Sequence, residues 1–502
     1  MSNNKLKFLQ RIPLTRSLAI VFLVLGVLLL ALVLTFFPSE QLHQAQQSQN
    51  TQQPQEPPVT EPPRTPLPED SAIIFDRLEL VTNDAFGDGT TYVPNGWGIH
   101  KNRIVRTNSG DIFVVYLAAG SDMTNRQWRL MHRAPDGTWT QINQGDAGVE
   151  PINILRGPND DLNLFAWPGT SGTLQYIHST DLGKTFTTTS IPGQWTTDQG
   201  YSGAGINDDG DMVIFQSGND KPGSFNWAYY TPSSNSWHFD TNTFDYRYTY
   251  AFFLPGNNNN LTIVGMRDVL RSELGYPSSN GFNYIFNAIK YFQLNDVHNP
   301  QQLYQLNVTQ AQPKNNSDSN ITYLSDVYID TLGRTHILYN NMYDGPHHTI
   351  IENSMVIKDV RQNISYGKKT RIVQDTTGRF YIIATDNNSL HVYPGAAGDT
   401  DGTQLDPVVS LNISNYPTCH DDDFCMSPTL TVPRNGHALQ NYVDGVYGYF
   451  NKVFYFRLQL RNDAPVTLTP AHPLPPQPNL FTALLEGYIL ESGSRRRSSP
   501  IP

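Results

Sequence analysis

Residues 179–186 read Ser-Thr-Asp-Leu-Gly-Lys-Thr-Phe and lie between two runs of alternating apolar residues. This arrangement is typical of two β-strands joined by a tight hairpin turn. Within the turn, the Asp181 carboxylate can accept backbone N–H groups, and Gly183 can adopt a positive φ angle. Phe186 can pack back beneath the turn. The residues therefore predict a self-contained corner between two strands.

The corner resembles the Asp-box, Ser-x-Asp-x-Gly-x-Thr-Trp/Phe, which recurs at the third hairpin of blades in sialidase-like β-propellers. Every specified position is matched, by Ser179, Asp181, Gly183, Thr185 and Phe186. The resemblance implies an all-β propeller and a structural role for these five residues, on the face away from the active site. Because many proteins that are not sialidases contain Asp-boxes, the motif indicates the fold more than the function.

A strand pattern recurs from Ile73 onward. The clearest internal match pairs Arg103–Gly110, followed by DIFVVY, with Arg371–Gly378, followed by RFYIIA. Further first turns occur near Asn159-Asp160, Asp209-Gly210, Asn257-Asn258, Gly333 and Gly436. Most spacings are about 45–58 residues, with one of about 75, close to the blade repeat of propellers. Sialidases have six blades and this chain has seven repeats, so we expect a six- or seven-bladed sialidase-like β-propeller over residues 72–464.

The composition agrees with many short strands and limits the partners. Aromatic residues make up 11% of the 502 residues, and there are 37 Gly and 35 Pro. The net charge is −11, and the ends of the chain are basic, with four positive charges in residues 1–16 and three in Arg495–Arg497. Removing these seven charges leaves −18 on the remainder. Such an acidic domain is not expected to bind nucleic acid.

Residues 17–37 form an uncharged apolar run that is long enough to cross a bilayer once. The basic residues 1–16 precede it, so the positive-inside rule predicts a cytoplasmic N-terminus and a single-pass, membrane-anchored protein with an extracytoplasmic domain. Residues 38–71 are rich in Pro and Gln and predict a disordered spacer. Residues 465–502 form a Pro-rich extension with a basic tail.

Two cysteines, Cys419 and Cys425, enclose five residues near the last repeat. In an oxidising compartment this spacing favours a small disulfide loop over a metal site. His420 and Asp421–Asp423 inside the loop leave Ca²⁺ binding open, although one loop rarely supplies enough oxygen ligands. We therefore expect no obligatory cofactor.

In a four-stranded blade, the connection into the first strand and the loop between the second and third strands lie on one face. Candidate functional residues were sorted by this rule. They are Arg103, Asp122, Asp220, Arg267, Asp268, Arg271, Glu273, Tyr343, Asp344, Arg371, Asp386 and Asp444.

Sialidases use a Tyr nucleophile with a Glu base, an Asp acid/base and three arginines that bind the substrate carboxylate. The resemblance implies that Arg103 holds a carboxylate and Asp122 acts as acid/base. By position alone, Tyr343 and Glu273 are candidate nucleophile and base, and Arg267, Arg271 and Arg371 are candidate carboxylate ligands. An Arg at a strand start is more often a rim group, and an Asp after a strand is a common turn former.

Two functions follow from this sequence. The first is a surface-exposed module that binds a glycan or a protein without catalysis. The second is an exo-sialidase that acts on an anionic terminal sugar. The incomplete catalytic set and the acidic domain favour the first.

Overall fold

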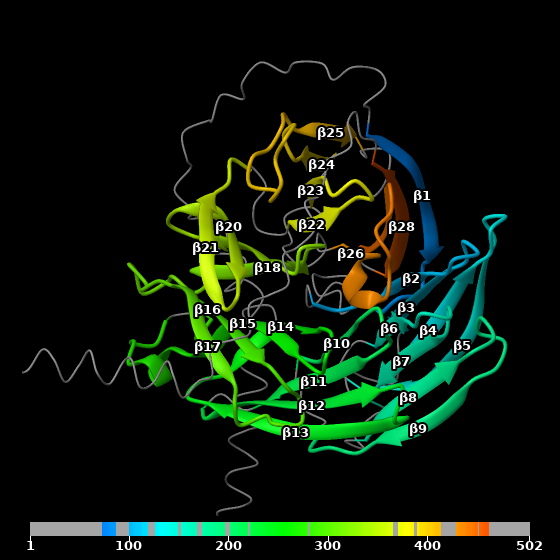
Figure 1. Ribbon diagram of the computed structural model, residues 1–502, viewed down its shortest axis with the longest axis horizontal. Coiled ribbons are helices and arrows are strands. Elements are labelled where there is room, and N and C mark those ends of the chain that lie inside the picture. Colours follow the sequence, from blue (N-terminus) through cyan, green and yellow to red (C-terminus); the bar gives the residue numbers. More distant parts are fainter. Residues whose placement is uncertain are drawn as a thin grey trace, which may run out of the picture. The chain divides into compact units, whose positions relative to one another are not determined.

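Seven four-stranded antiparallel sheets form a ring in the described part of the chain (Figure 1). The computed structural model describes residues 73–86, 100–118, 126–148, 152–167, 173–195, 201–218, 221–279, 282–364, 370–385, 389–412, 428–449 and 451–460. The blade count therefore follows the seven sequence repeats, and the alternative of six blades is excluded.

The first four blades occupy consecutive segments. Blade 1 contains β2 (Ile104–Arg106), β3 (Ile112–Ala118), β4 (Arg126–Arg133) and β5 (Trp139–Ala147). Blade 2 contains β6 (Asn153–Arg156), β7 (Leu162–Ala166), β8 (Leu174–Ser179) and β9 (Thr187–Ile191). Blade 3 contains β10 (Gly203–Ile206), β11 (Met212–Gly218), β12 (Gly223–Thr231) and β13 (Ser236–Phe244). Blade 4 contains β14 (Tyr248–Pro255), β15 (Leu261–Leu270), β16 (Tyr284–Leu294) and β17 (Tyr304–Gln310), with the 3₁₀ helix η2 (Arg271–Leu274) after β15.

The last three blades complete the ring. Blade 5 contains β18 (Thr322–Ile329), β19 (Thr335–Asn341), β20 (Gly345–Glu352) and β21 (Met355–Arg361). Blade 6 contains β22 (Arg371–Gln374), β23 (Phe380–Thr385), β24 (Ser389–Pro394) and β25 (Val409–Asn412). Blade 7 contains β26 (Thr429–Leu430), the 3₁₀ helix η4 (Pro433–Asn435), β27 (Tyr442–Tyr449) and β28 (Lys452–Gln459). Its outermost strand is β1 (Ile74–Thr82), so the two ends of the propeller sequence share one sheet.

The first turns of six blades are tight, as the repeat pattern predicts. In blades 1 and 6, Gly110 and Gly378 have φ angles of 94° and 87°, which glycine adopts without steric strain. In blade 7, Gly436 lies in a longer loop that contains η4. The corner at residues 179–186 joins β8 to β9, the third and fourth strands of blade 2.

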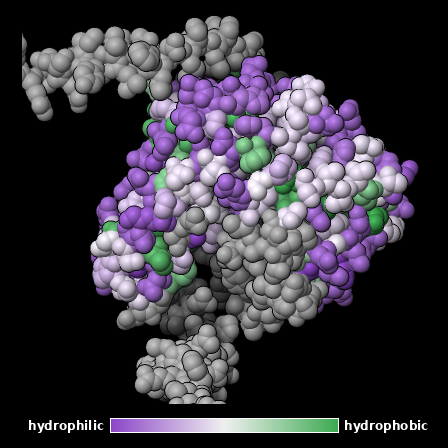
Figure 2. All heavy atoms as spheres, turned by 90° about the horizontal axis from the view of Figure 1, so that it is seen from below, coloured by the Kyte–Doolittle hydropathy of each residue, from purple (hydrophilic) through white to green (hydrophobic). Residues whose placement is uncertain are grey.

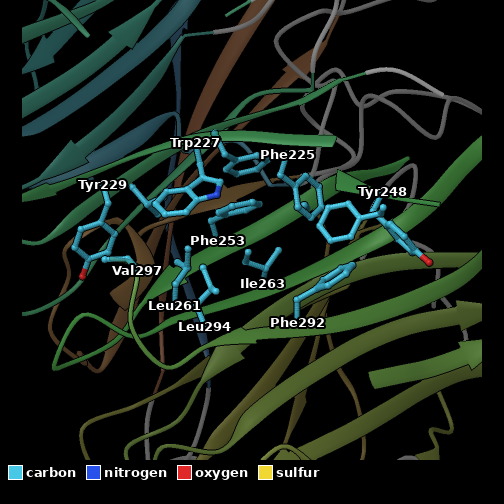
Figure 3. Packing of buried hydrophobic residues seen from close by; sticks show 14 residues of the cluster. Phe225, Trp227, Tyr229, Tyr248, Phe253, Leu261, Ile263, Phe292, Leu294 and Val297 are labelled. Atoms are coloured by element: carbon cyan, nitrogen blue, oxygen red, sulfur yellow. The ribbon is translucent and has the colours of Figure 1, made fainter. Parts of the chain in front are cut away.

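Aromatic side chains fill the space between neighbouring blades. Figure 3 shows this packing between blades 3 and 4, where Trp227 and Phe225 of β12 face Phe253 of β14 and Phe292 of β16. The rings of Phe215 and Phe253 stack with centroids 3.8 Å apart. Strands buried on both faces of a sheet need apolar residues at successive positions, which explains runs such as IFVVYLA in β3.

All seven sheets lie in the unit formed by residues 62–277 and 284–502. A second unit comprises Met1–Glu61 and Ser278–Asn283, and in it the Ser279 N–H donates to Asn283 Oδ1 at 3.1 Å. The face shown in Figure 2 is mainly hydrophilic, with hydrophobic residues in small separate areas.

The predicted anchor at 17–37, the spacer at 38–71 and the extension at 465–502 lie outside the described residues. Within the described ranges, no helix is long and apolar enough to cross a bilayer. The membrane anchor and the cell-surface location therefore stay predictions.

Candidate functional site

We call one end of the ring the entry face, because there the chain enters the innermost strands and the second strand of each blade connects to the third. Figure 1 shows the innermost strands, among them β10, β14, β22 and β26, around the centre of the ring. Arg103 lies directly before β2, and Arg371 is the first residue of β22. Both therefore reach the axis at the entry face, as the sequence pattern predicts.

Arg103 and Arg371 are almost fully buried, at 3% and 1% exposure. Nε of Arg103 donates to Thr429 Oγ1 at 3.0 Å. Burial and the charge of Arg371 lower the pKa of Arg103 to about 9. The structure thus brings together two of the four predicted carboxylate ligands.

A third buried arginine, Arg434, comes from η4 in blade 7. Its Nη1 donates to Asp326 Oδ1 of blade 5 at 2.8 Å, and its guanidinium lies 5.0 Å from the ring centroid of Phe252 in blade 4. Blade 7 is adjacent to neither blade 4 nor blade 5, so these contacts form across the centre of the ring. Arg434 therefore occupies the axis.

Lys101 and His100 extend this axial cluster. Lys101 Nζ donates to Ser202 Oγ at 2.9 Å, and His100 Nε2 lies 2.8 Å from the Ser202 carbonyl oxygen. Burial, followed by the charge of Lys101, keeps the pKa of His100 well below its usual 6.5. His100 is accordingly neutral at neutral pH, and the positive charge belongs to the lysine and the arginines.

A second group lies on the entry face of blades 3 to 5, and we call it the tyrosine rim. It consists of five half-buried tyrosines, each with a Lys or Arg over its ring at distances from 4.1 to 5.9 Å. The pairs are Lys221 and Arg267 with Tyr246, Arg247 with Tyr201 and Tyr284, Arg271 with Tyr276, and Lys314 with Tyr343.

The other two predicted arginines belong to this rim. Arg267 Nε donates to Asn287 Oδ1 at 2.9 Å, and burial lowers the pKa of Arg267. Arg271 Nε and Nη1 donate to the carbonyl oxygens of Pro277 and Asp318 at 3.0 and 2.6 Å. Among the described residues, neither arginine forms an ion pair with a carboxylate. Their charges are therefore not balanced by a carboxylate, and both side chains are buried, at 7% and 1% exposure.

Tyr343 and Glu273, the candidate nucleophile and base, have different partners. The Tyr343 hydroxyl donates to Asp318 Oδ2 at 2.5 Å and accepts the Lys314 backbone N–H at 2.9 Å. Burial, followed by the bond to Asp318, raises the pKa of Tyr343 to about 12. Glu273 pairs with Lys221 at 3.4 Å. The carboxylate that contacts Tyr343 is thus Asp318, which the sequence did not single out.

The remaining candidates have varied positions. Asp122, Asp220, Asp386, Cys419, His420, Asp421–Asp423 and Cys425 lie outside the described residues. Asp268 pairs with Arg247 at 3.1 Å on the entry face, and Asp344 lies in the turn between β19 and β20.

The expected position of Asp444 was wrong. It lies near the start of β27, at the opposite end of the strand from the entry face, and its Oδ1 accepts from Arg457 Nε at 2.7 Å. The long loop containing η4 delays the second strand of blade 7, so Asp444 belongs to that strand rather than to the loop after it.

Sequence reasoning missed Arg434 and four of the five rim tyrosines, all except Tyr343. A signal for part of the rim exists: Tyr246-Arg247 directly precede an innermost strand, in the position that Asn102-Arg103 occupy in blade 1. No comparable signal marks Arg434, because it lies in a first-turn position, which the sorting rule assigns to the other face.

No family model matches the chain, and a search of curated proteins found no match. Solved structures do resemble it. The polysaccharide lyase Uly1 has a TM-score of 0.46 at 12% identity over 77% of this chain and 100% of that chain. A protein from Lactobacillus plantarum has a TM-score of 0.41 at 10% identity over 64% and 86% of the two chains. The α-L-arabinofuranosidase Arb93A from Fusarium graminearum has a TM-score of 0.35 at 12% identity over 66% and 99%. At these values the function must be argued from the residues of this chain.

Proposed function

We propose that this propeller binds an acidic glycan on its entry face without hydrolysing it. The observation that carries the proposal is the tyrosine rim, where five half-buried phenol rings each adjoin a cation. A tyrosine ring offers an apolar surface to the C–H groups of a sugar, and its hydroxyl can form hydrogen bonds. The exposed Lys314, together with the buried Arg267 and Arg271, supplies positive charge for a carboxylate.

Electrostatics support an anionic rather than a neutral glycan. The chain carries a net charge of −11, so an anion is repelled by most of the surface. The rim nevertheless has five cations, of which Lys221 and Arg247 pair with Glu273 and Asp268. The other three, Arg267, Arg271 and Lys314, form no ion pair with a carboxylate within the described residues. A local cationic site within an acidic domain favours ligands with a defined negative group.

Binding of 3′-sialyllactose and lactose to the full-length chain, measured by titration calorimetry, tests the proposal. We expect the acidic sugar to bind and Tyr246→Ala to weaken it by roughly tenfold or more. Tyr442→Ala is the matched control, since Tyr442 also has arginines over its ring, at 4.3 and 4.9 Å, but lies at the start of β27 on the opposite face. Equal binding of both sugars, or loss of binding in the control alone, would refute an acidic-glycan site at the rim.

A second candidate function is hydrolysis by an exo-sialidase mechanism. The contact in its favour is the 2.5 Å hydrogen bond between Tyr343 and Asp318, which places a carboxylate beside a phenol. The raised pKa of Tyr343 opposes formation of the phenolate and so supports binding over catalysis. Release of a fluorescent phenol from a sialoside by the full-length chain, abolished in Tyr343→Phe, would establish hydrolysis instead.

A further inference from the structure

Arg371 is buried at the axis with hydrogen bonds to backbone carbonyl groups alone. Its Nε donates to Pro428 O at 2.8 Å, and its Nη1 donates to Ser325 O at 2.5 Å and to Thr370 O at 3.1 Å. Its Nη2 is buried and has no hydrogen-bond partner within the described ranges. No carboxylate in the described part of the chain contacts this guanidinium.

Arg434 presents further N–H groups to the same region. Its Nη1 is bonded to Asp326 Oδ1, whereas its Nε and Nη2 are buried without a partner among the described residues. The second oxygen of Asp326 accepts the Ile372 backbone N–H at 3.0 Å. Asp326 therefore provides one negative charge for two guanidinium groups. One positive charge of this pair remains unbalanced.

An unbalanced buried charge is costly. A guanidinium does not lose its proton at neutral pH, and burying an unpaired ion is unfavourable even after the surroundings relax. The two arginines also lie near each other, because Arg434 binds the Asp326 carboxylate and Arg371 binds the carbonyl oxygen of the adjacent Ser325. A negative partner at this place would remove the cost.

We propose that a small monovalent inorganic anion with the chemistry of chloride binds at the axis between Arg371 and Arg434. It accepts N–H groups from Arg371 Nη2 and from Nε or Nη2 of Arg434. Asp326 offsets one of the two guanidinium charges of this pair, so a single negative charge completes the balance between Arg371 and Arg434. The small size follows from burial, since Arg371 and Arg434 are 1% and 7% exposed.

The anion has a structural consequence that is independent of the proposed glycan site. Arg371 begins blade 6 and is bonded to carbonyl groups next to blades 5 and 7, and Arg434 belongs to blade 7. An anion between them links blades 6 and 7 directly, and blade 5 through the bonds of the two arginines to Ser325 and Asp326. It should therefore stabilise the folded propeller in proportion to its occupancy.

Thermal unfolding of the full-length chain tests this inference. We expect sodium chloride to raise the melting temperature saturably, by roughly 2–4 °C, relative to sodium isethionate at the same ionic strength. Arg371→Met should abolish the difference in melting temperature between chloride and isethionate. The control Arg361→Met removes an exposed arginine of β21 and should keep the effect. Equal melting temperatures of the unmodified chain in both salts would overturn the inference.

Two further measurements complete the test. If Arg371→Met does not fold, anomalous diffraction from bromide-soaked crystals of the unmodified chain decides the matter, and the absence of a peak beside Arg371 and Arg434 would refute the site. Sodium glucuronate in the same melting experiment distinguishes an inorganic anion from the carboxylate of a sugar. A rise with glucuronate and none with chloride would assign the two arginines to the carboxylate of a sugar instead.

Discussion

A single carboxylate organises the corner at residues 179–186. Oδ1 of Asp181 accepts the backbone N–H groups of Lys184 and Thr185 at 3.1 and 2.9 Å, and its Oδ2 accepts the Thr185 hydroxyl at 2.7 Å. These are the local bonds that the residue pattern predicts. The hydroxyl and the backbone N–H of Thr185 lower the pKa of Asp181 to about 2.

This shift makes a prediction about acid stability. Because the pKa is lower in the folded state than the usual value of about 3.9, ionised Asp181 stabilises the fold above pH 4. The contribution should disappear as the pH falls from about 4 to about 2. In urea unfolding at pH 7, 4 and 2.5, Asp181→Asn should be less stable at pH 7 and lose less stability on acidification. Asp209→Asn, at an exposed turn position of blade 3, is the control. Equal acid sensitivity of Asp181→Asn and the unmodified chain would contradict the assignment.

At the scale of elements, the loop between β26 and β27 departs from the other first turns and determines the axis. Its 3₁₀ helix η4 brings Arg434 to Asp326, and Asn435 Nδ2 donates to Ile104 O of blade 1 at 3.2 Å. Gly436 ends the helix with a φ angle of 98°. A Cβ atom there would lie 1.8 Å from the Arg156 carbonyl oxygen of blade 2, so only glycine fits.

Two glycine substitutions distinguish the cost of a steric clash from the cost of a positive φ angle. Gly333→Ala, at a φ angle of 80° with nothing within 4 Å of the added Cβ, should cost about 1 kcal/mol for the positive φ angle. Gly436→Ala has the same conformational cost and the clash in addition, so we expect about 3 kcal/mol or more. Denaturant unfolding measures both. Equal losses would mean that the η4 loop shifts freely and does not hold Arg434 in place.

At the scale of the whole molecule, β1 closes the ring. It forms the outer edge of blade 7, and its Glu79 reaches blade 1. The Glu79 carboxylate accepts Nε and Nη2 of Arg133, both at 2.6 Å, and Nε1 of Trp139 at 2.9 Å. Burial alone would raise the pKa of Glu79, but these hydrogen bonds keep it below its usual value.

Glu79→Gln should therefore weaken the junction between the first and last blades. Loss of the bidentate, charged hydrogen bonds to Arg133 is expected to lower the free energy of unfolding by about 1–2 kcal/mol. The value is modest because the carboxylate is partly exposed. Asp76→Asn is the control, because the exposed Asp76 lies in the same strand and, within the described residues, pairs with its sequence neighbour Arg77 and with no residue of blade 1. Thermal unfolding gives both values. A control loss as large as that of Glu79→Gln would show that the effect belongs to the strand and not to the closure.

The sequence alone determined the repeated strands, the turn residues, the seven repeats and the internal geometry of the 179–186 corner. These features depend on contacts between residues near one another in the chain, so periodicity and turn chemistry reveal them. The positions of Arg103 and Arg371 followed as well, because a rule about blade topology places strand starts on one face.

Only the tertiary structure decided which charged groups meet. Arg434 and Asp326 are 108 residues apart, and Lys101 and Ser202 are 101 apart. Such pairs form because the ring brings distant strands to one axis, and no local pattern encodes the partner. The same reason explains why Tyr343 contacts Asp318 rather than Glu273: the contact depends on how two loops pack, which spacing along the chain does not specify.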